Sequence, residues 1–280
     1  LKVTGLNLLH RFRTKQITRT YTGKKDSEVF EALVGEIRDE LGGKIPGLQL
    51  ELNSAELSRN KETESAIQTL KLDNEYPLKF IFTRAFEIGY EFTMDEDVSD
   101  RRKVTFHYRP PHYVVRPTYV LEWGKSLLSF QPSFKTAQQV DKVIVRAWNP
   151  AQKAAFVGEA TRAQMLELGL LDPSADLQVR RGPLAERTET VVDSTIQSQE
   201  EANQVAQKRM RQIAQGLVTG RGKTIGLPDL RAGVKIDVRG LGARFSGIYY
   251  VEGTTHSLGD GGYTTEFTAR MEEKGAGAQT

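Results

Sequence analysis

The string most suggestive of catalysis in this sequence is Gly222-Lys223-Thr224, which has the ending of a phosphate-binding loop. That motif needs a glycine five residues before its second glycine, and the residue there is Leu217. A phosphate-binding loop also leads from a strand into a helix N-terminus, whereas this string follows an expected helix and precedes Ile225-Gly226-Leu227-Pro228. We therefore interpret it as a glycine-rich loop of a β-barrel and expect no nucleotide or other cofactor.

Metal binding is the second candidate chemistry. Histidines stand at positions 10, 107, 112 and 256, and none forms the helical pair with glutamate that a zinc hydrolase needs. His107 and His112 flank a double proline, where we expect a solvated loop. The run Asp95-Glu96-Asp97 resembles the start of a calcium loop, but Asp100 and Phe106 stand where that loop needs glycine and glutamate. We expect a charged hairpin tip there and no metal.

The remaining catalytic candidates lack partners. Glu122 has no second carboxylate arranged as in a glycosidase, and we expect its neighbour Trp123 to lie in the core. No Gly-x-Ser-x-Gly string marks a nucleophile elbow, and the chain contains no cysteine. The sequence therefore predicts that the protein is not an enzyme.

Charge argues against a dedicated nucleic-acid binder. The 280 residues carry a net charge of +3, from 39 Lys and Arg against 36 Asp and Glu, which gives no strong field for phosphates. The stretch from Arg101 to Arg116 nevertheless mixes cations with His107 and Tyr108, as single-strand-binding surfaces do. A nucleic-acid-binding or nucleotide-dependent module thus stays as the alternative. No apolar run reaches the roughly 20 residues that span a bilayer, and we expect no membrane binding.

Periodicity indicates a mixture of helices and strands. A helix is expected from Asp26, with Asp26 or Ser27 as cap, another over 74–86 with Pro77 in its first turn, and a third from Ser198, which forms a capping box with Glu201. A short helix is expected at 161–168 and a polar connector at 172–187. Strands are expected at 90–93, 103–108, 119–130 and 142–148.

The last quarter of the sequence shows the clearest strand pattern. Val234, Ile236 and Val238 alternate with polar residues, which predicts one buried and one wet face, and Tyr249 and Val251 share a face of the next strand. A turn at 259–262 leads to a last alternating strand over 263–271. These strands predict an α+β protein with a small, closed or half-closed antiparallel β-barrel braced by the helix from Ser198.

The order of these segments resembles the phage late control protein D family, the central hub of contractile tails. The similar positions are Leu121–Gly124, Leu127–Pro132, Val143–Pro150, Gly158, Gly220, Gly222, Gly226, Pro228, Leu230, Gly233, Val238, Gly247, Tyr249, Val251, His256, Gly262–Thr265 and Phe267, with the two upstream helices and Ile88–Phe92. They extend over nearly the whole chain.

The resemblance implies a structural baseplate hub of a contractile phage tail or related injection system. Such a hub forms a trimeric ring that joins the hexameric tail tube to the central spike, and each chain carries two tube-type β-barrels. Residues 1–22 would end a first barrel lying mainly before Leu1. Residues 23–117 with 151–213 would form a mixed α/β side domain, residues 118–150 with 214–273 the second barrel, and residues 274–280 a tail or linker.

The resemblance also implies partners. They are two further copies of the chain, the tail tube protein, the central spike protein and other baseplate proteins, assembled in the bacterial cytoplasm into a virion or injection particle. The spike domains of the related VgrG proteins do not follow Met271, so either a separate spike protein docks or the chain has been cut. Charged barrel positions would line a wet surface or a lumen that passes DNA or protein: Lys235, Asp237, Arg239, Glu266 and Arg270.

The turn between the last two strands is the expected interface. Gly259, Gly261 and Gly262 should project beyond the barrel rim toward an adjacent ring, because loops at the end of a barrel are free to meet a partner. Tyr263 should anchor the base of the turn on the core face, with Thr264 on the wet face.

Overall fold

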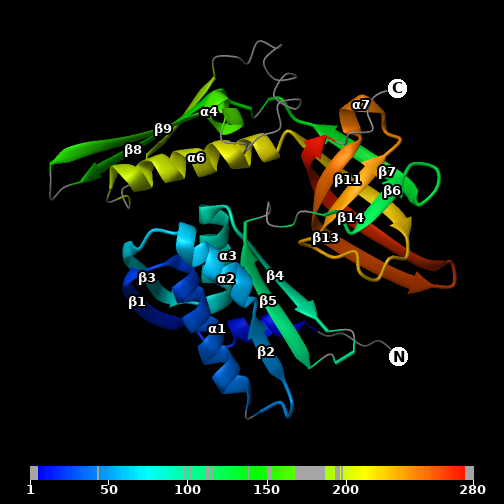
Figure 1. Cartoon of the computed structure of the whole chain (residues 1–280), viewed down its shortest axis with the longest axis horizontal. Helices are drawn as coiled ribbons and strands as arrows, with labels where there is room; N and C mark the ends of the chain where they lie inside the picture. Colours follow the sequence, from blue (N-terminus) through cyan, green and yellow to red (C-terminus); the bar gives the residue numbers. More distant parts are fainter. Residues whose placement is uncertain are drawn as a thin grey trace. The chain divides into compact units, whose positions relative to one another are not determined.

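A computed structural model of the chain describes residues 6–274 except 43, 98, 101, 111–113, 115, 138, 150–152, 168–186, 193–195 and 197. It consists of two compact units, Leu1–Tyr113 and Val114–Thr280 (Figure 1). Each unit combines helices with sheets, as expected for an α+β protein. Most of the connector expected at 172–187, His112 and the tail at 275–280 lie outside the described residues.

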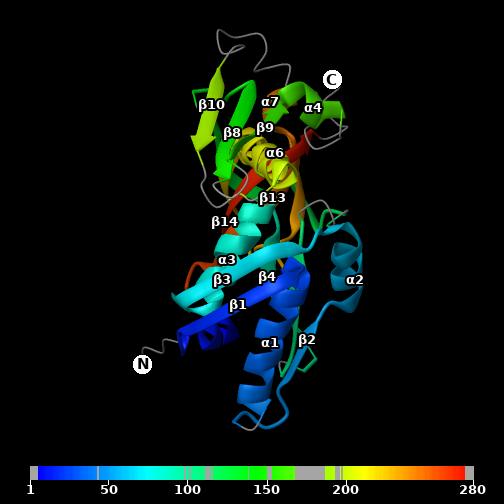
Figure 2. The ribbon, with the colours of Figure 1, turned by 90° about the vertical axis from the view of Figure 1, so that its left-hand side faces the viewer.

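The first unit contains a two-stranded and a three-stranded sheet. Strands β1 and β3 pair antiparallel (Figure 2), while β5 pairs antiparallel with β4 and parallel with β2. The elements are η1 (Leu8–Arg13), β1 (Ile17–Lys24), α1 (Asp26–Gly42), β2 (Gln49–Leu52), α2 (Ser54–Thr63), β3 (Ile67–Glu75), α3 (Pro77–Ile88), β4 (Glu91–Glu96) and β5 (Lys103–Arg109).

Aromatic rings fill the core of the first unit. Phe92 contacts four other rings, with centroid distances of 6.1 Å to Phe12, 5.3 Å to Phe30, 5.6 Å to Phe82 and 5.6 Å to Phe106. Edge-to-face and offset-stacked arrangements at these distances add to the stabilisation from burial. The expected helix from Asp26 and the strands near 90–93 and 103–108 are confirmed, and these elements supply most of this core.

The N-terminus of α1 is stabilised differently from the prediction. The first-turn residue Glu28 accepts a hydrogen bond from the Lys25 N–H at 2.9 Å. Asp26 instead binds the guanidinium of Arg84 on α3 at 2.6 Å, and the Ser27 hydroxyl donates to Glu64 at 2.7 Å. The two expected cap residues therefore fasten α1 to other elements.

Helix α3 agrees closely with the prediction. Pro77 is its first residue, and Gly89 ends it in the left-handed region with φ 70° and ψ 26°. Proline is tolerated in a first turn because its missing N–H has no intrahelical partner there. Glycine adopts the left-handed conformation without the penalty that a Cβ brings.

The second unit is dominated by a curled six-stranded sheet with the order β6-β12-β13-β14-β11-β7 (Figure 1). Its neighbours are antiparallel except β6 and β12, which are parallel. Its strands are β6 (Tyr119–Glu122), β7 (Leu127–Phe134), β11 (Val218–Ile225), β12 (Lys235–Arg239), β13 (Gly247–Gly259) and β14 (Gly262–Lys274), with the short helix α7 (Gly242–Phe245) between β12 and β13.

The single strand expected over 119–130 is two strands. The chain turns after β6, where Gly124 has φ 78°, and resumes as β7. Trp123 lies at this turn with 48% of its surface exposed, so the prediction that it belongs to the core was wrong. A residue at a strand end lacks the neighbours on both sides that would cover a ring of this size.

Strand β11 contains the Gly222-Lys223-Thr224 string, which we had placed in a loop. A Cβ on Gly220 would lie within 3.0 Å of the Phe130 ring, and a Cβ on Gly222 within 3.0 Å of the Phe267 ring. Both rings belong to neighbouring strands, and both are buried. The glycines therefore give two aromatic rings direct access to the backbone of β11, and the string stands in a strand that leads into no helix.

The second unit also holds a three-stranded sheet with the order β10-β8-β9. Its strands are β8 (Lys142–Asn149), β9 (Ala154–Thr161) and β10 (Thr188–Val192), accompanied by the helices α4 (Arg162–Glu167) and α6 (Gln199–Gln215). The strand near 142–148, which the sequence grouped with the barrel, thus pairs outside the six-stranded sheet. The short helix expected at 161–168 is confirmed as α4.

Helix α6 packs along this smaller sheet and meets the curled one at its end, where Gln215 donates to Glu272 of β14 at 3.3 Å. It therefore does not lie along the curled sheet as the expected brace. Its apolar face, which includes Ala202 and Met210, joins one buried cluster with Val143 and Val145 of β8 (Figure 1). A Cβ on Gly158 of β9 would overlap the main chain of α6, so the helix and the strand are in direct contact. One half of the predicted capping box is confirmed, because the Ser198 hydroxyl accepts the Glu201 N–H at 3.1 Å.

Strand β12 lacks the wet face that its alternation predicted. Lys235 and Asp237 are buried along with the apolar positions between them. Lys235, Tyr250 and Arg270 stand side by side on three strands, and the Arg270 guanidinium lies 4.6 Å from the Tyr250 ring centre and 2.9 Å from Glu272. Large side chains cover this face, so Lys235, Asp237 and Arg270 do not form the expected wet surface, whereas Arg239 and Glu266 are exposed.

Two neighbouring substitutions test whether the string in β11 is a strand or a phosphate-binding loop. Gly222→Ala should lower the free energy of unfolding by about 1–3 kcal/mol, because its methyl group collides with the Phe267 ring. Lys223→Ala removes only an exposed ion pair with Glu266, so it should change the free energy of unfolding by less than about 0.5 kcal/mol. Urea unfolding of both variants measures this, and the reverse order would contradict the strand assignment.

Candidate functional site

The hairpin of β13 and β14 extends beyond its neighbours in the curled sheet. The two strands pair up to Gly259 opposite Gly262, which leaves Asp260 and Gly261 as the tip. Strand β12 pairs only with Gly247–Tyr250 of β13, and β11 pairs with β14 only as far as Thr264. The outer part of the hairpin therefore projects beyond the rest of the sheet (Figure 1).

The expected interface residues lie at this tip. Gly259, Gly261 and Gly262 are exposed, and a Cβ on any of them would meet nothing within 4 Å. Gly262 has φ 97°, which suits glycine in a tight hairpin. Leu258 next to them is 83% exposed.

Tyr263 connects the hairpin to the loop that precedes β12. Its ring lies against Gly226, where a Cβ would come within 3.0 Å, and its hydroxyl is 2.9 Å from His256 Nδ1. The other ring nitrogen of His256 is 3.1 Å from the Leu230 carbonyl oxygen. Thr264 is half-buried, so it is less exposed than expected. The base of the hairpin is held in place while its tip remains open.

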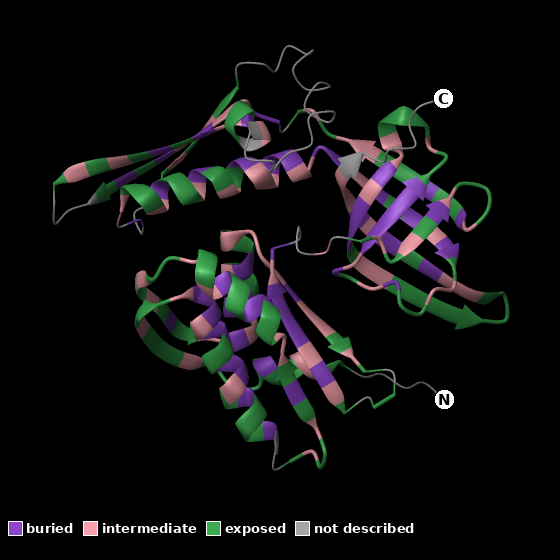
Figure 3. Ribbon diagram, in the orientation of Figure 1, coloured by how far each residue is buried: buried purple, intermediate pink, exposed green. Residues whose placement is uncertain are grey.

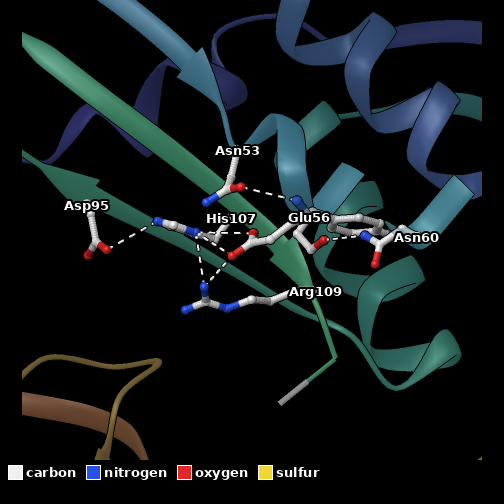
Figure 4. Close-up of polar contacts among 7 residues, drawn as sticks. Asn53, Glu56, Asn60, Asp95, His107 and Arg109 are labelled. Carbon is white, nitrogen blue, oxygen red and sulfur yellow. Dashed lines mark hydrogen bonds and ion pairs between the residues drawn. The ribbon is translucent and has the colours of Figure 1, made fainter. Parts of the chain in front are cut away.

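A cluster of buried charges lies in the first unit (Figure 4). Glu56 of α2 faces His107 and Arg109 of β5, with Glu56 Oε1 3.0 Å from His107 Nδ1 and in a short ion pair with Arg109. The second ring nitrogen, Nε2, is 3.2 Å from Asp95 of β4. The Asn53 side chain caps α2 by accepting the Glu56 N–H at 3.1 Å, which fixes the start of the helix that carries Glu56.

The cluster holds His107 in its charged form. Burial opposes protonation, but hydrogen bonds to Asp95 and Glu56 outweigh it and raise the pKa of His107 to about 9. With both nitrogens donating, this imidazolium can neither ligate a metal nor accept a proton near neutral pH. His107 lies in a strand, so the expectation of a solvated loop was wrong at this residue. Within the described residues, no group of three or more His, Asp or Glu side chains is arranged so that it could hold a metal ion.

Sequence reasoning missed this cluster because its members are far apart in the chain. Glu56 and His107 are 51 positions apart, and helix α2 was not predicted. The pairing of β4 with β5 places Asp95 opposite Thr105, which is two residues before His107 on the same strand. An expected hairpin between these strands could have suggested the Asp95 contact, but no local signal indicates Glu56.

The other candidate residues find local partners. Glu122 pairs with Lys125 at 2.8 Å on the surface. In the basic stretch, Lys103 pairs with Glu51 at 3.5 Å, while Phe106 and Tyr108 are buried and offer no platform on which bases could stack. None of the helices within the described ranges is long and apolar enough to cross a membrane.

Comparison with known proteins identifies a family. A family model described as the Alg8 N-terminal domain matches residues 10–260. No curated protein matches the sequence.

Solved structures of tail proteins are similar in fold. The 43 kDa tail protein of prophage MuSo2 from Shewanella oneidensis has a TM-score of 0.63 at 12% identity, over 95% of this chain and 73% of that one. A tail protein from Neisseria meningitidis has a TM-score of 0.59 at 13% identity, over 92% and 70%. An Escherichia coli component of the type VI secretion system, described as similar to T4 bacteriophage tail proteins, reaches 0.50 at 13% identity, over 94% and 52%. The chain thus has the fold of phage tail proteins.

The charged cluster predicts a pH dependence of stability. Because the pKa of His107 is about 9 in the folded protein and near its ordinary 6.5 when unfolded, its contribution is complete below about pH 6.5 and disappears as pH rises through 9. The free energy of unfolding should fall by about 1–3 kcal/mol over that interval, as for hydrogen bonds to charged groups. Urea unfolding at several pH values measures this.

The control is His107→Gln, which keeps a polar side chain but does not titrate. It should flatten the dependence between pH 6.5 and 9, while Gln207→Ala, at an exposed position of the second unit, should leave it unchanged. An identical slope in His107→Gln and the unmodified protein would contradict the assignment.

Proposed function

The chain belongs to the Alg8 N-terminal domain family, and from its tail-protein fold and its resemblance to the late control protein D family we propose that it is a structural baseplate hub of a contractile phage tail or related injection system. In this proposal three copies form a ring that joins the hexameric tail tube to the central spike. The observation that supports it most is the likeness to two bacterial tail proteins over 92% and 95% of the chain. The resemblance to the late control protein D family supports the hub role in particular.

The side-chain chemistry of the described residues suits a structural role. The most concentrated group of charges, around His107, is an internally compensated network that fastens α2 to β5. Lys223 is an exposed strand residue paired with Glu266, which leaves no phosphate-binding loop to support the alternative of a nucleotide-dependent module. The buried Phe106 and Tyr108 remove the main argument for a nucleic-acid-binding module.

The proposed partners are the tail tube protein, the central spike protein and other baseplate proteins. The hairpin tip at Gly259, Gly261 and Gly262, with Tyr263 at its base, is the proposed contact to an adjacent ring. Its exposed Leu258 would bury apolar surface in such a contact. The division into a first-barrel remnant, a side domain and a second barrel remains part of the proposal, with β8 moved to the side domain because it pairs with β9 and β10. Passage of DNA or protein through a central lumen, in a particle assembled in the bacterial cytoplasm, is also part of it.

Lengthening the hairpin tests this role. Three Gly or Ser residues inserted between Asp260 and Gly261 should spare folding, because doubling a loop costs only about 0.6 kcal/mol, but should block stacking of the next ring. Circular dichroism checks the fold, and electron microscopy counts full-length tails.

The matched control is the same insertion between Ala243 and Arg244, two exposed residues of α7 at the other end of β13. It should leave tails intact. Normal tails from the Asp260 insertion would show that the hairpin is not an interface, whereas loss of tails only from the α7 insertion would assign the contact to the opposite end.

A further inference from the structure

The three-stranded sheet of the second unit has one face covered by α6 and one face open to solvent. Along β8, Val143, Val145 and Ala147 are buried toward α6, so the positions between them point the other way. The register of β8 with β9 and β10 identifies the neighbours on that open face. We call it the outer face, and it consists of Lys142, Ile144, Arg146, Trp148, Ala155, Val157, Glu159, Thr161, Thr188, Thr190 and Val192.

Exposed and half-buried positions alternate with buried ones along β8 (Figure 3). Those on the outer face include apolar side chains, where a solvated sheet face would be polar. Trp148 is 57% exposed, Val157 42% and Val192 80%, and Ile144 between them is half-buried. Apolar side chains gathered on one exposed face of a sheet favour a partner there.

Arg146 lies at the centre of the apolar group. It stands opposite Val157 on one side and Val192 on the other. The neighbouring Lys142 is neutralised by Glu159 at 2.7 Å, whereas Arg146 has no carboxylate partner among the described residues. Arginine and tryptophan together, ringed by aliphatic side chains, have the composition of an interface hot spot.

We propose that the outer face docks a different protein, through a surface that presents a carboxylate to Arg146 within an apolar surround. A symmetric contact between two copies of this face would bring Arg146 toward Arg146, and such like-charge contacts are unfavourable. At the edge of β9, the Gln199 side chain accepts from the Val157 N–H at 3.3 Å and donates to the Val157 carbonyl oxygen at 2.7 Å. Because these backbone groups are already bonded, the partner docks on the face of the sheet and not along that edge. The inference rests on the proposed function, since the partner is a component of the same particle.

Cysteine labelling tests the docking, because the natural chain has no cysteine. In Val192→Cys, maleimide should react readily with the isolated chain and at least about tenfold more slowly in purified particles, as expected for a buried interface position. In the control Gln207→Cys, on an exposed part of α6, the two rates should be alike.

Equal labelling of Val192→Cys in particles and in the isolated chain would overturn the docking face alone. Protection that already exists in the isolated chain and grows with its concentration would assign the face to a second copy and also overturn the proposal. Absence of the unmodified chain from purified particles, measured by mass spectrometry, would instead overturn the proposed function.

Charge variants test the chemistry of the partner. Arg146→Glu should reduce incorporation of the chain into particles by about tenfold or more, because it sets two carboxylates against each other. Arg146→Lys keeps the charge and should retain most incorporation. Equal incorporation of Arg146→Glu and Arg146→Lys, both folded by circular dichroism, would overturn the proposed carboxylate.

Discussion

The contact between aromatic rings and the glycines of β11 is the constraint on which the curled sheet depends. Phe130 from β7 and Phe267 from β14 lie directly on Gly220 and Gly222, and Tyr263 lies on Gly226 just beyond the strand. Any larger residue at these positions would displace a ring and with it a neighbouring strand. The same contacts bring β7 and β14 close to β11, and the contact of Tyr263 with Gly226 fixes the base of the projecting hairpin. Ring-on-glycine packing therefore shapes both the sheet and the proposed interface.

The buried charged side chains pair with partners of the same unit. In the first unit, Glu56 and Asp95 neutralise a protonated His107, and Asp26 holds Arg84 between α1 and α3. In the second unit, Arg270 lies over Tyr250 and beside Glu272. Buried charges of this kind require partners, because an unpaired one would be strongly destabilising. They fix how helices and strands meet, which suits a protein whose role is to hold a shape within an assembly.

The sequence predicted elements better than it predicted their neighbours. Helices α1 and α3 and the capped start of α6 were found from periodicity, Pro77 and Ser198, since these signals are local. Helix α6 was expected to pack mainly on the curled sheet, whereas it packs mainly on the three-stranded one. Its apolar face, with Ala202 and Met210, does not reveal which sheet it covers. Lys235 and Asp237 were expected to be exposed to solvent, since alternation cannot show that Tyr250 would stand beside Lys235 or that Arg239 would pair with Asp237. His107 was misread because Glu56 comes from a helix 51 positions away.

The central claim is that this fold acts as a subunit of a ring, and the mass of the full-length chain in solution tests it most directly. Light scattering at micromolar concentration should give three times the mass of one chain. A chain mass that stays monomeric across the concentrations found in assembling cells would contradict the account.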